Sequence, residues 1–156
     1  SKINKQLCDR AKQGMFVTLV YILLDIKTGQ ICFSNAGHIS PLFVDEQGAQ
    51  TMGSHQAKGP PLGILPEAEY GQDRFMVKNK GMVLIYTDGI IEAKNQDQKL
   101  YGENRLKGVV ESFPADPVLL VRKIADSVDH FSRGRDQSDD LTLVCFKREA
   151  FEPPSL

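Results

Sequence analysis

Apolar residues fall in short runs along much of this chain, and the runs predict β-strands. The segment MFVTLVYILL (15–24) is rich in β-branched and aromatic residues, which favours a buried strand. The turn DIKTG (25–29) leads into the alternating QICFSN (30–35), so these two runs are expected to pair as a hairpin. Further short strands are predicted over 41–44, 74–78, 82–87 and 141–147.

Helical periodicity dominates the region between the last two of these strands. GENRLKGVVES (102–112) predicts a short helix, and 116–132 predicts a longer one. Asp116 is a natural N-cap and Pro117 suits the first helical position. Spacings of four, four and three give one apolar face, made of Leu120, Ile124, Val128 and Phe131. Strands followed by helices and a closing strand indicate an α+β layered fold.

Between residues 45 and 71 the periodicity stops, and glycine and proline punctuate the chain. A long loop in a compact domain is typically a functional flap or a connector. The stretch GPPLGILP (59–66) lacks the Lys-Ser/Thr pair of a phosphate-cradling P-loop, and we interpret it as a candidate flap. The last residues, 149–156, show no pattern and are predicted to be a frayed tail.

Composition is that of one ordinary globular domain, with 156 residues, 41% hydrophobic and 25% charged. Net charge is −1 and neither sign forms a block, so nothing indicates a nucleic-acid or polybasic membrane surface. No apolar run approaches the roughly 20 residues of a membrane helix, and the polar start does not resemble a signal peptide. Cys8, Cys32 and Cys145 show no paired spacing, which predicts reduced thiols and a cytoplasmic protein.

Acidic residues stand at the ends of two predicted strands. Asp88 follows the apolar run 82–87, where a buried carboxylate would be costly, and Asp139–Asp140 precede 141–147. If these strands are antiparallel neighbours, the carboxylates converge at one sheet edge. Clustered carboxylates suit Mg²⁺ or Mn²⁺, which can activate water and clamp a phosphoryl oxygen. Asp-Gly is equally a common turn dipeptide, and Asp139–Asp140 could be solvated, so both interpretations stay open on these residues alone.

Four segments occur together in an order and spacing that resembles the SpoIIE/RsbU-type bacterial phosphatases of the PPM family, which are metal-dependent and type-2C-like. These segments are 15–44 (with NAGH inside it), PPLGI, LIYTDGIIEA and DDLTLV, and the resemblance runs from Met15 to Lys147. It implies a PPM-type layered α-β-β-α sandwich with antiparallel strands and two C-terminal helices. Residues 1–148 would be the C-terminal portion of a single such domain, incomplete because the family's first segment, with a further Asp-Gly metal motif, has no counterpart here.

The resemblance also implies chemistry. The intact domain would be a hydrolase that removes phosphate from serine or threonine on a regulatory phosphoprotein, such as an anti-sigma-factor antagonist in stress signalling. Asp88 and Asp139 would ligate a pair of Mn²⁺ or Mg²⁺ ions, with Asp140 and Gly89 beside them. The residues expected near the site are Asn35, Ala36, Gly37, His38 and Gly63, with His38 either a proton carrier or a structural turn residue.

Two arginines just before Asp139 are candidates to contact a substrate phosphate. Arg133 and Arg135 could bind a phosphate bidentately, although exposed loop arginines are commonly only solvated. Without the family's first segment, we expect this chain alone to bind metal weakly, to have little or no activity, and to self-associate through an uncovered sheet face. Two alternatives stay open, a catalytically silent PPM-fold interaction module in signalling and a structural α+β domain whose aspartates only form turns.

Overall fold

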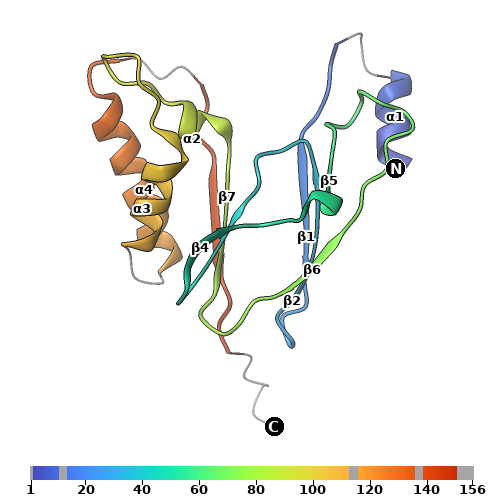
Figure 1. Cartoon of the computed structure of the whole chain (residues 1–156), viewed down its shortest axis with the longest axis horizontal. Coiled ribbons are helices and arrows are strands. Elements are labelled where there is room, and N and C mark those ends of the chain that lie inside the picture. Colours follow the sequence, from blue (N-terminus) through green and yellow to red (C-terminus); the bar gives the residue numbers. More distant parts are fainter. Residues whose placement is uncertain (1, 11–13, 113–115, 136–138, 151–156) are drawn as a thin grey trace. The chain divides into compact units, whose positions relative to one another are not determined.

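The computed structural model describes residues 2–10, 14–112, 116–135 and 139–150. They divide into two compact units, one made of 1–40 and 52–77 and the other of 41–51 and 78–156. Each unit contains its own four-stranded sheet (Figure 1). The strands are mostly antiparallel and are combined with α-helices, so the predicted α+β class is confirmed.

The first unit is built around a central strand, β2. Its elements are α1 (Lys2–Arg10), β1 (Leu19–Leu24), β2 (Gln30–Ala36), the 3₁₀ turn η1 (His55–Ala57), β5 (Lys58–Gly59) and β6 (Asp73–Met76). Strand β2 pairs antiparallel with β1 and β6 and parallel with the two-residue β5. The β1–β2 hairpin predicted from the sequence is confirmed. Its turn is fixed by Asp25 Oδ1, which accepts bonds from the amides of Lys27 and Thr28.

Strand β1 is not the buried strand that its composition predicts. It lies at the edge of the first sheet, and Leu19, Tyr21 and Leu23 on one face are 40–58% exposed. The alternate residues on the opposite face are only half-buried. The prediction was wrong on burial because an apolar run reports strand propensity, whereas burial depends on what packs on both faces.

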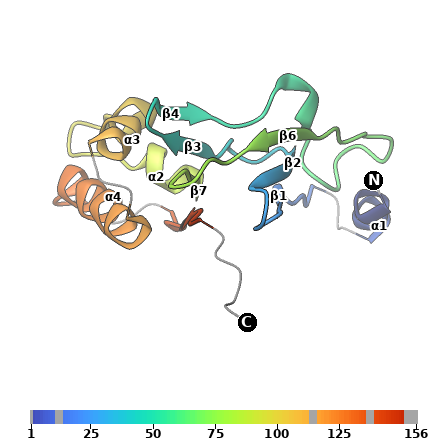
Figure 2. The same ribbon diagram turned by 90° about the horizontal axis from the view of Figure 1, so that it is seen from below.

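The second unit contains both predicted metal ligands, which lie next to the ends of its strands. Its elements are β3 (Leu42–Asp45), β4 (Gly48–Thr51), β7 (Met82–Tyr86), α2 (Asp88–Glu92), α3 (Gly102–Glu111), α4 (Pro117–Ser132) and β8 (Leu143–Lys147). The strand order is β4-β3-β7-β8, and every pair is antiparallel. Figures 1 and 2 show α3 and α4 side by side against this sheet. Strand β7 is central and almost wholly buried, as its continuous apolar sequence requires.

Helix α4 confirms both its predicted cap and its predicted apolar face. Asp116 Oδ1 accepts a bond of 2.9 Å from the amide of Leu119, which satisfies one of the free N–H groups of the first turn. Leu120, Ile124 and Val128 are fully or almost fully buried. Phe131 is half-buried and completes the face at the C-terminal end of the helix.

An aromatic contact joins α4 to the start of α3. Tyr101 is 1% exposed, and its ring meets Phe131 edge to face with centroids 5.5 Å apart. Its hydroxyl lies 2.8 Å from Ser127 Oγ, so the buried polar atom has a partner. Arg105 covers the other side of Phe131, with its guanidinium carbon 4.6 Å from the ring centroid. These contacts fix α3 and α4 as one layer.

The predicted loop over 45–71 is partly wrong, because it contains β4, η1 and β5. Strand β4 has the sequence GAQT, which lacks the apolar alternation that predicts a strand. Its pairing with β3 depends instead on a tight turn, in which Asp45 Oδ1 accepts from the amide of Gln47 and Gly48 adopts φ +108°. Of the predicted frayed tail, residues 151–156 lie outside the described residues. No helix in the part of the chain that the structure describes has the length and apolarity needed to span a bilayer.

Replacing the cap of α4 tests whether this helix depends on it. Asp116→Ala removes the acceptor for the Leu119 amide, and we expect the free energy of unfolding to fall by about 1 kcal/mol. Asp116→Asn keeps a side-chain oxygen and should stay close to the original stability. Urea denaturation followed by circular dichroism measures both variants. Equal stability of the alanine and asparagine variants would contradict the role of the cap.

Candidate functional site

The pairing of β7 with β8 brings the end of one strand to the start of the other. The register runs from Met82 opposite Lys147 to Tyr86 opposite Leu143. It continues beyond the strands, because the Thr87 amide donates to Thr142 O at 3.2 Å and the Thr142 amide donates to Thr87 Oγ1 at 3.0 Å. The two strands are thus antiparallel neighbours, as the convergence of Asp88 with Asp139–Asp140 requires.

A close backbone contact holds α2 against the segment that contains Asp139 and Asp140. Thr87 Oγ1 donates to Asp140 O at 3.2 Å. A Cβ placed on Gly89 would lie 2.5 Å from the same carbonyl oxygen, a distance that no side chain can occupy. Gly89 is therefore a close-approach residue, and the first turn of α2 lies directly on the backbone of Asp140.

All three carboxylates at this edge are exposed, so none of them carries the burial cost suggested by the apolar run before Asp88. Asp88 Oδ1 accepts from the Gly89 amide at 3.1 Å, and Asp139 Oδ1 accepts from the Asp140 amide at 2.8 Å. Each bond orients one carboxylate relative to its own backbone. The site therefore presents oriented, accessible anionic oxygens at the end of a rigid central strand.

Buried titratable groups flank this edge within the same sheet. Burial, together with the negative charge of Glu103, raises the pKa of Tyr86 to about 12. Burial also raises the pKa of the Cys145 thiol to about 11. Both groups stay neutral near pH 7, so the exposed aspartates supply the negative charge at this end of β7 and β8.

The chemistry of these donors fits one side of a magnesium or manganese site. Both ions prefer hard carboxylate oxygens, and Mg²⁺ usually keeps several waters alongside one or two carboxylates. Among the described residues, however, no group of three His, Cys, Asp or Glu side chains is arranged to hold a metal ion. Asp88 and Asp139 can thus contribute ligands to an ion without forming a complete site with their described neighbours.

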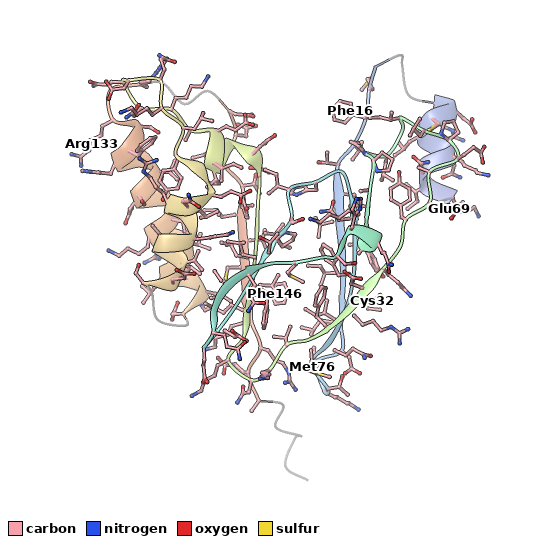
Figure 3. The ribbon with its side chains drawn as sticks, in the orientation of Figure 1. Phe16, Cys32, Glu69, Met76, Arg133 and Phe146 are labelled. Atoms are coloured by element: carbon pink, nitrogen blue, oxygen red, sulfur yellow. The ribbon has the colours of Figure 1, made fainter. Side chains whose placement is uncertain are left out.

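The two predicted phosphate-binding arginines lie in a loop after α4, next to a cavity of about 270 Å³ that Gly89 and Asp139 also line. Arg135 Nη1 donates to Asn95 O at 3.3 Å, so its guanidinium is directed to the loop after α2. Figure 3 shows the side chain of Arg133 pointing outward from the end of α4. The structure brings both arginines to the wall of the cavity that Asp139 also lines.

The predicted NAGH turn belongs to the first unit and is closed by its own hydrogen bonds. Asn35 is 1% exposed; its Oδ1 accepts from the His38 amide at 2.8 Å and its Nδ2 donates to His38 O at 2.9 Å. Gly37 has φ +69°, and a Cβ there would overlap the ring of Pro61. The Nδ1 atom of His38 lies 2.8 Å from Ile39 O, a contact that suits a structural turn histidine.

Gly63 is held by a residue that sequence reasoning missed. The Gly63 amide donates to Asn4 Oδ1 at 2.9 Å, and Asn4 Nδ2 donates to Leu65 O at 2.8 Å. Asn4 is fully buried on α1, so this side chain fixes the stretch that the sequence suggests as a flap. An asparagine on a short polar helix carries no local signal for such a role, because its partners lie about 60 residues away in sequence.

The contact at Gly89 can be tested by adding one methyl group. Gly89→Ala places a Cβ against Asp140 O, and we expect a loss of about 1–3 kcal/mol in the free energy of unfolding. Gly108→Ala is the matched control, because a Cβ there meets no atom within 4 Å and the residue lies inside α3. That variant should gain about 0.5–1 kcal/mol. Urea denaturation measures both, and a neutral Gly89→Ala variant would contradict the close packing.

Comparison with known proteins identifies the family. The family model described as Stage II sporulation protein E (SpoIIE) matches residues 1–149. The chain is 30% identical over 129 residues to the phosphoserine phosphatase RsbP of Bacillus subtilis, covering 83% of this chain and 30% of RsbP. It is 25% identical over 147 residues to the phosphoserine phosphatase RsbU of the same organism, covering 94% of this chain and 43% of RsbU. The chain spans less than half the length of the curated relatives that it matches.

Solved structures agree on the fold. The phosphatase domain of SpoIIE from Bacillus subtilis, from a crystal presoaked with manganese, superposes with a TM-score of 0.73 at 18% identity. The match covers 97% of this chain and 65% of that one. Its level of identity supports the fold alone, whereas the family model covers nearly the whole sequence. The chain therefore belongs to the SpoIIE family.

Proposed function

We propose that this chain is part of a metal-dependent protein serine/threonine phosphatase domain. The observation that carries the proposal is the convergence of Asp88 with Asp139–Asp140 across β7 and β8 in a member of this family. The phosphoserine phosphatases RsbP and RsbU among its relatives support phosphoserine as the substrate class. We further propose a regulatory phosphoprotein, such as an anti-sigma-factor antagonist, as the natural substrate.

In this proposal Asp88 and Asp139 hold Mn²⁺ or Mg²⁺. A bound ion of this kind supplies Lewis-acid polarisation of phosphoryl oxygens and lowers the pKa of water. The chain's own residues prepare the site: Thr87 and Gly89 hold α2 on the Asp140 backbone, and the amides of Gly89 and Asp140 orient the two carboxylates. Because the carboxylates are exposed, they can bind an ion and a substrate without any rearrangement of the sheet.

Activity of the full-length protein tests this function. We expect Mn²⁺-dependent release of phosphate from a phosphoserine peptide. Asp88→Asn and Asp139→Asn should each reduce the rate on the order of 100-fold or more, because a metal ion contributes several kcal/mol of transition-state stabilisation. Asp126→Asn, an exposed carboxylate on α4, is the control and should leave the rate unchanged.

Unchanged activity in both ligand variants would contradict the assignment. A full-length protein that hydrolyses nothing with Mn²⁺ would favour the second candidate, a catalytically silent PPM-fold interaction module. This second candidate is supported by one observation: among the described residues, no three His, Cys, Asp or Glu side chains are arranged to hold a metal ion.

Metal binding by this chain alone is a separate test. Two carboxylates with water in the other positions make a low-affinity site, so we expect calorimetry to show weak binding of Mn²⁺. The heat should disappear in the Asp88→Asn variant and persist in Asp126→Asn. Tight binding by the isolated chain would contradict the proposal that Asp88 and Asp139 form only one side of the site.

A further inference from the structure

The cavity beside Asp139 has the features of a binding site for a charged group. It lies between the start of α2, the C-terminal part of α4 and the loop that follows α4. The described residues that line it include three basic and two acidic ones, namely Lys94, Arg133, Arg135, Asp129 and Asp139. Among these described residues the basic ones outnumber the acidic ones, which favours an anionic group.

One residue of the cavity wall, Ser132, has a side-chain hydroxyl without a hydrogen-bond partner among the described residues. The Oγ atom of this hydroxyl is buried. Buried hydroxyls are normally bonded, so Ser132 keeps an unused hydrogen-bonding capacity beside the cavity. Apolar side chains also line the cavity, contributed by Ala93, Ala125, Val128 and Leu141. Apolar walls with a few convergent polar groups are typical of ligand sites.

The wall is also held in place from outside the cavity. Gln96 Nε2 donates to Arg133 O at 3.3 Å, and Arg135 Nη1 donates to Asn95 O at 3.3 Å. Gly134 has φ +81°, and a Cβ there would lie 2.5 Å from Gln96 Nε2. The loop after α2 therefore fixes the backbone that carries the two arginines, which lowers the cost of ordering them around a ligand.

We propose that this cavity is a specificity subsite that accepts an acidic side chain of the substrate, close in sequence to the phosphoserine. The inference rests on the proposed phosphatase function, since the cavity shares Gly89 and Asp139 with that site. A carboxylate suits the cavity because guanidinium groups bind carboxylates through paired hydrogen bonds. The phosphate itself would lie at Asp88 and Asp139, which leaves this neighbouring cavity to the residues flanking it.

A positional scan of phosphopeptides tests the subsite on the full-length protein with Mn²⁺. Each peptide carries one glutamate at a different distance from the phosphoserine. Lys94→Gln and Arg135→Gln remove charge, and the glutamine at 135 still offers an N–H donor to Asn95 O. At the position that reaches the cavity, we expect kcat/KM to fall about fivefold in each variant, as for a partly exposed charge pair.

Two control measurements show whether the loss of activity is specific to the flanking glutamate. Hydrolysis of p-nitrophenyl phosphate, which has no flanking residue, should be unchanged in Lys94→Gln. Arg122→Gln, an exposed arginine of α4 outside the cavity lining, should change neither substrate. Arg135→Glu should shift the preference at the responsive position from glutamate to lysine.

Binding without catalysis separates failure of the subsite from failure of the proposed function. Fluorescence anisotropy with the dephosphorylated glutamate peptide and no metal should show weaker binding in Arg135→Gln. A protein that binds this peptide selectively but hydrolyses nothing keeps the subsite and loses the phosphatase assignment. A scan in which no position responds to either variant would overturn the subsite. Equal losses on the peptide and on p-nitrophenyl phosphate would overturn it too, because they would place these cations at the phosphate itself.

Discussion

The antiparallel pairing of β7 and β8 is the constraint on which the second unit depends. The backbone hydrogen bonds between the two strands determine which residues after β7 lie next to those before β8. Thr87 extends this pairing beyond the strands through its hydrogen bonds with Thr142 and Asp140. A slip of one residue in this register would turn the side chains to the opposite face. The close contact at Gly89 opposes such a slip, because only a glycine fits against Asp140 O.

The helical layer supports the same edge from the side. The cap at Asp116 starts α4, the buried face of α4 packs toward the sheet, and the Tyr101–Phe131 contact joins α3 to it. The end of α4 then delivers Ser132 and the loop with Arg135 to the cavity beside Asp139. Helix packing and strand register thus both fix the positions of the residues around the proposed site. Side chains carried on rigid elements are held more accurately in place than side chains on loops.

Much of this arrangement could be predicted from the sequence, and the failures have physical reasons. The strands β7 and β8 and the capped helix α4 carry strong local patterns, so their positions follow from apolar periodicity and one N-cap. The pairing of β7 with β8 was only a condition of the metal-site hypothesis, and the structure supplies it. The burial of β1 and the existence of β4 depend on tertiary neighbours and a tight turn, which no local pattern reports. Asn4 and Ser132 matter through distant partners or a cavity wall, and single residues of this kind have no sequence signature.

Exposure of Asp88 changes the significance of the apolar run before it. Met82, Val83 and Leu84 of β7 are buried in the centre of the sheet, and the run ends before the carboxylate, which is exposed at the start of α2. No desolvation cost is therefore stored in this aspartate. A buried strand that ends in an exposed carboxylate gives a ligand a fixed position without the penalty of a buried charge. The same principle applies at Asp139, whose orientation comes from the adjacent amide rather than from burial. Rigid backbone and accessible oxygens are the combination that binding of a hydrated divalent ion requires.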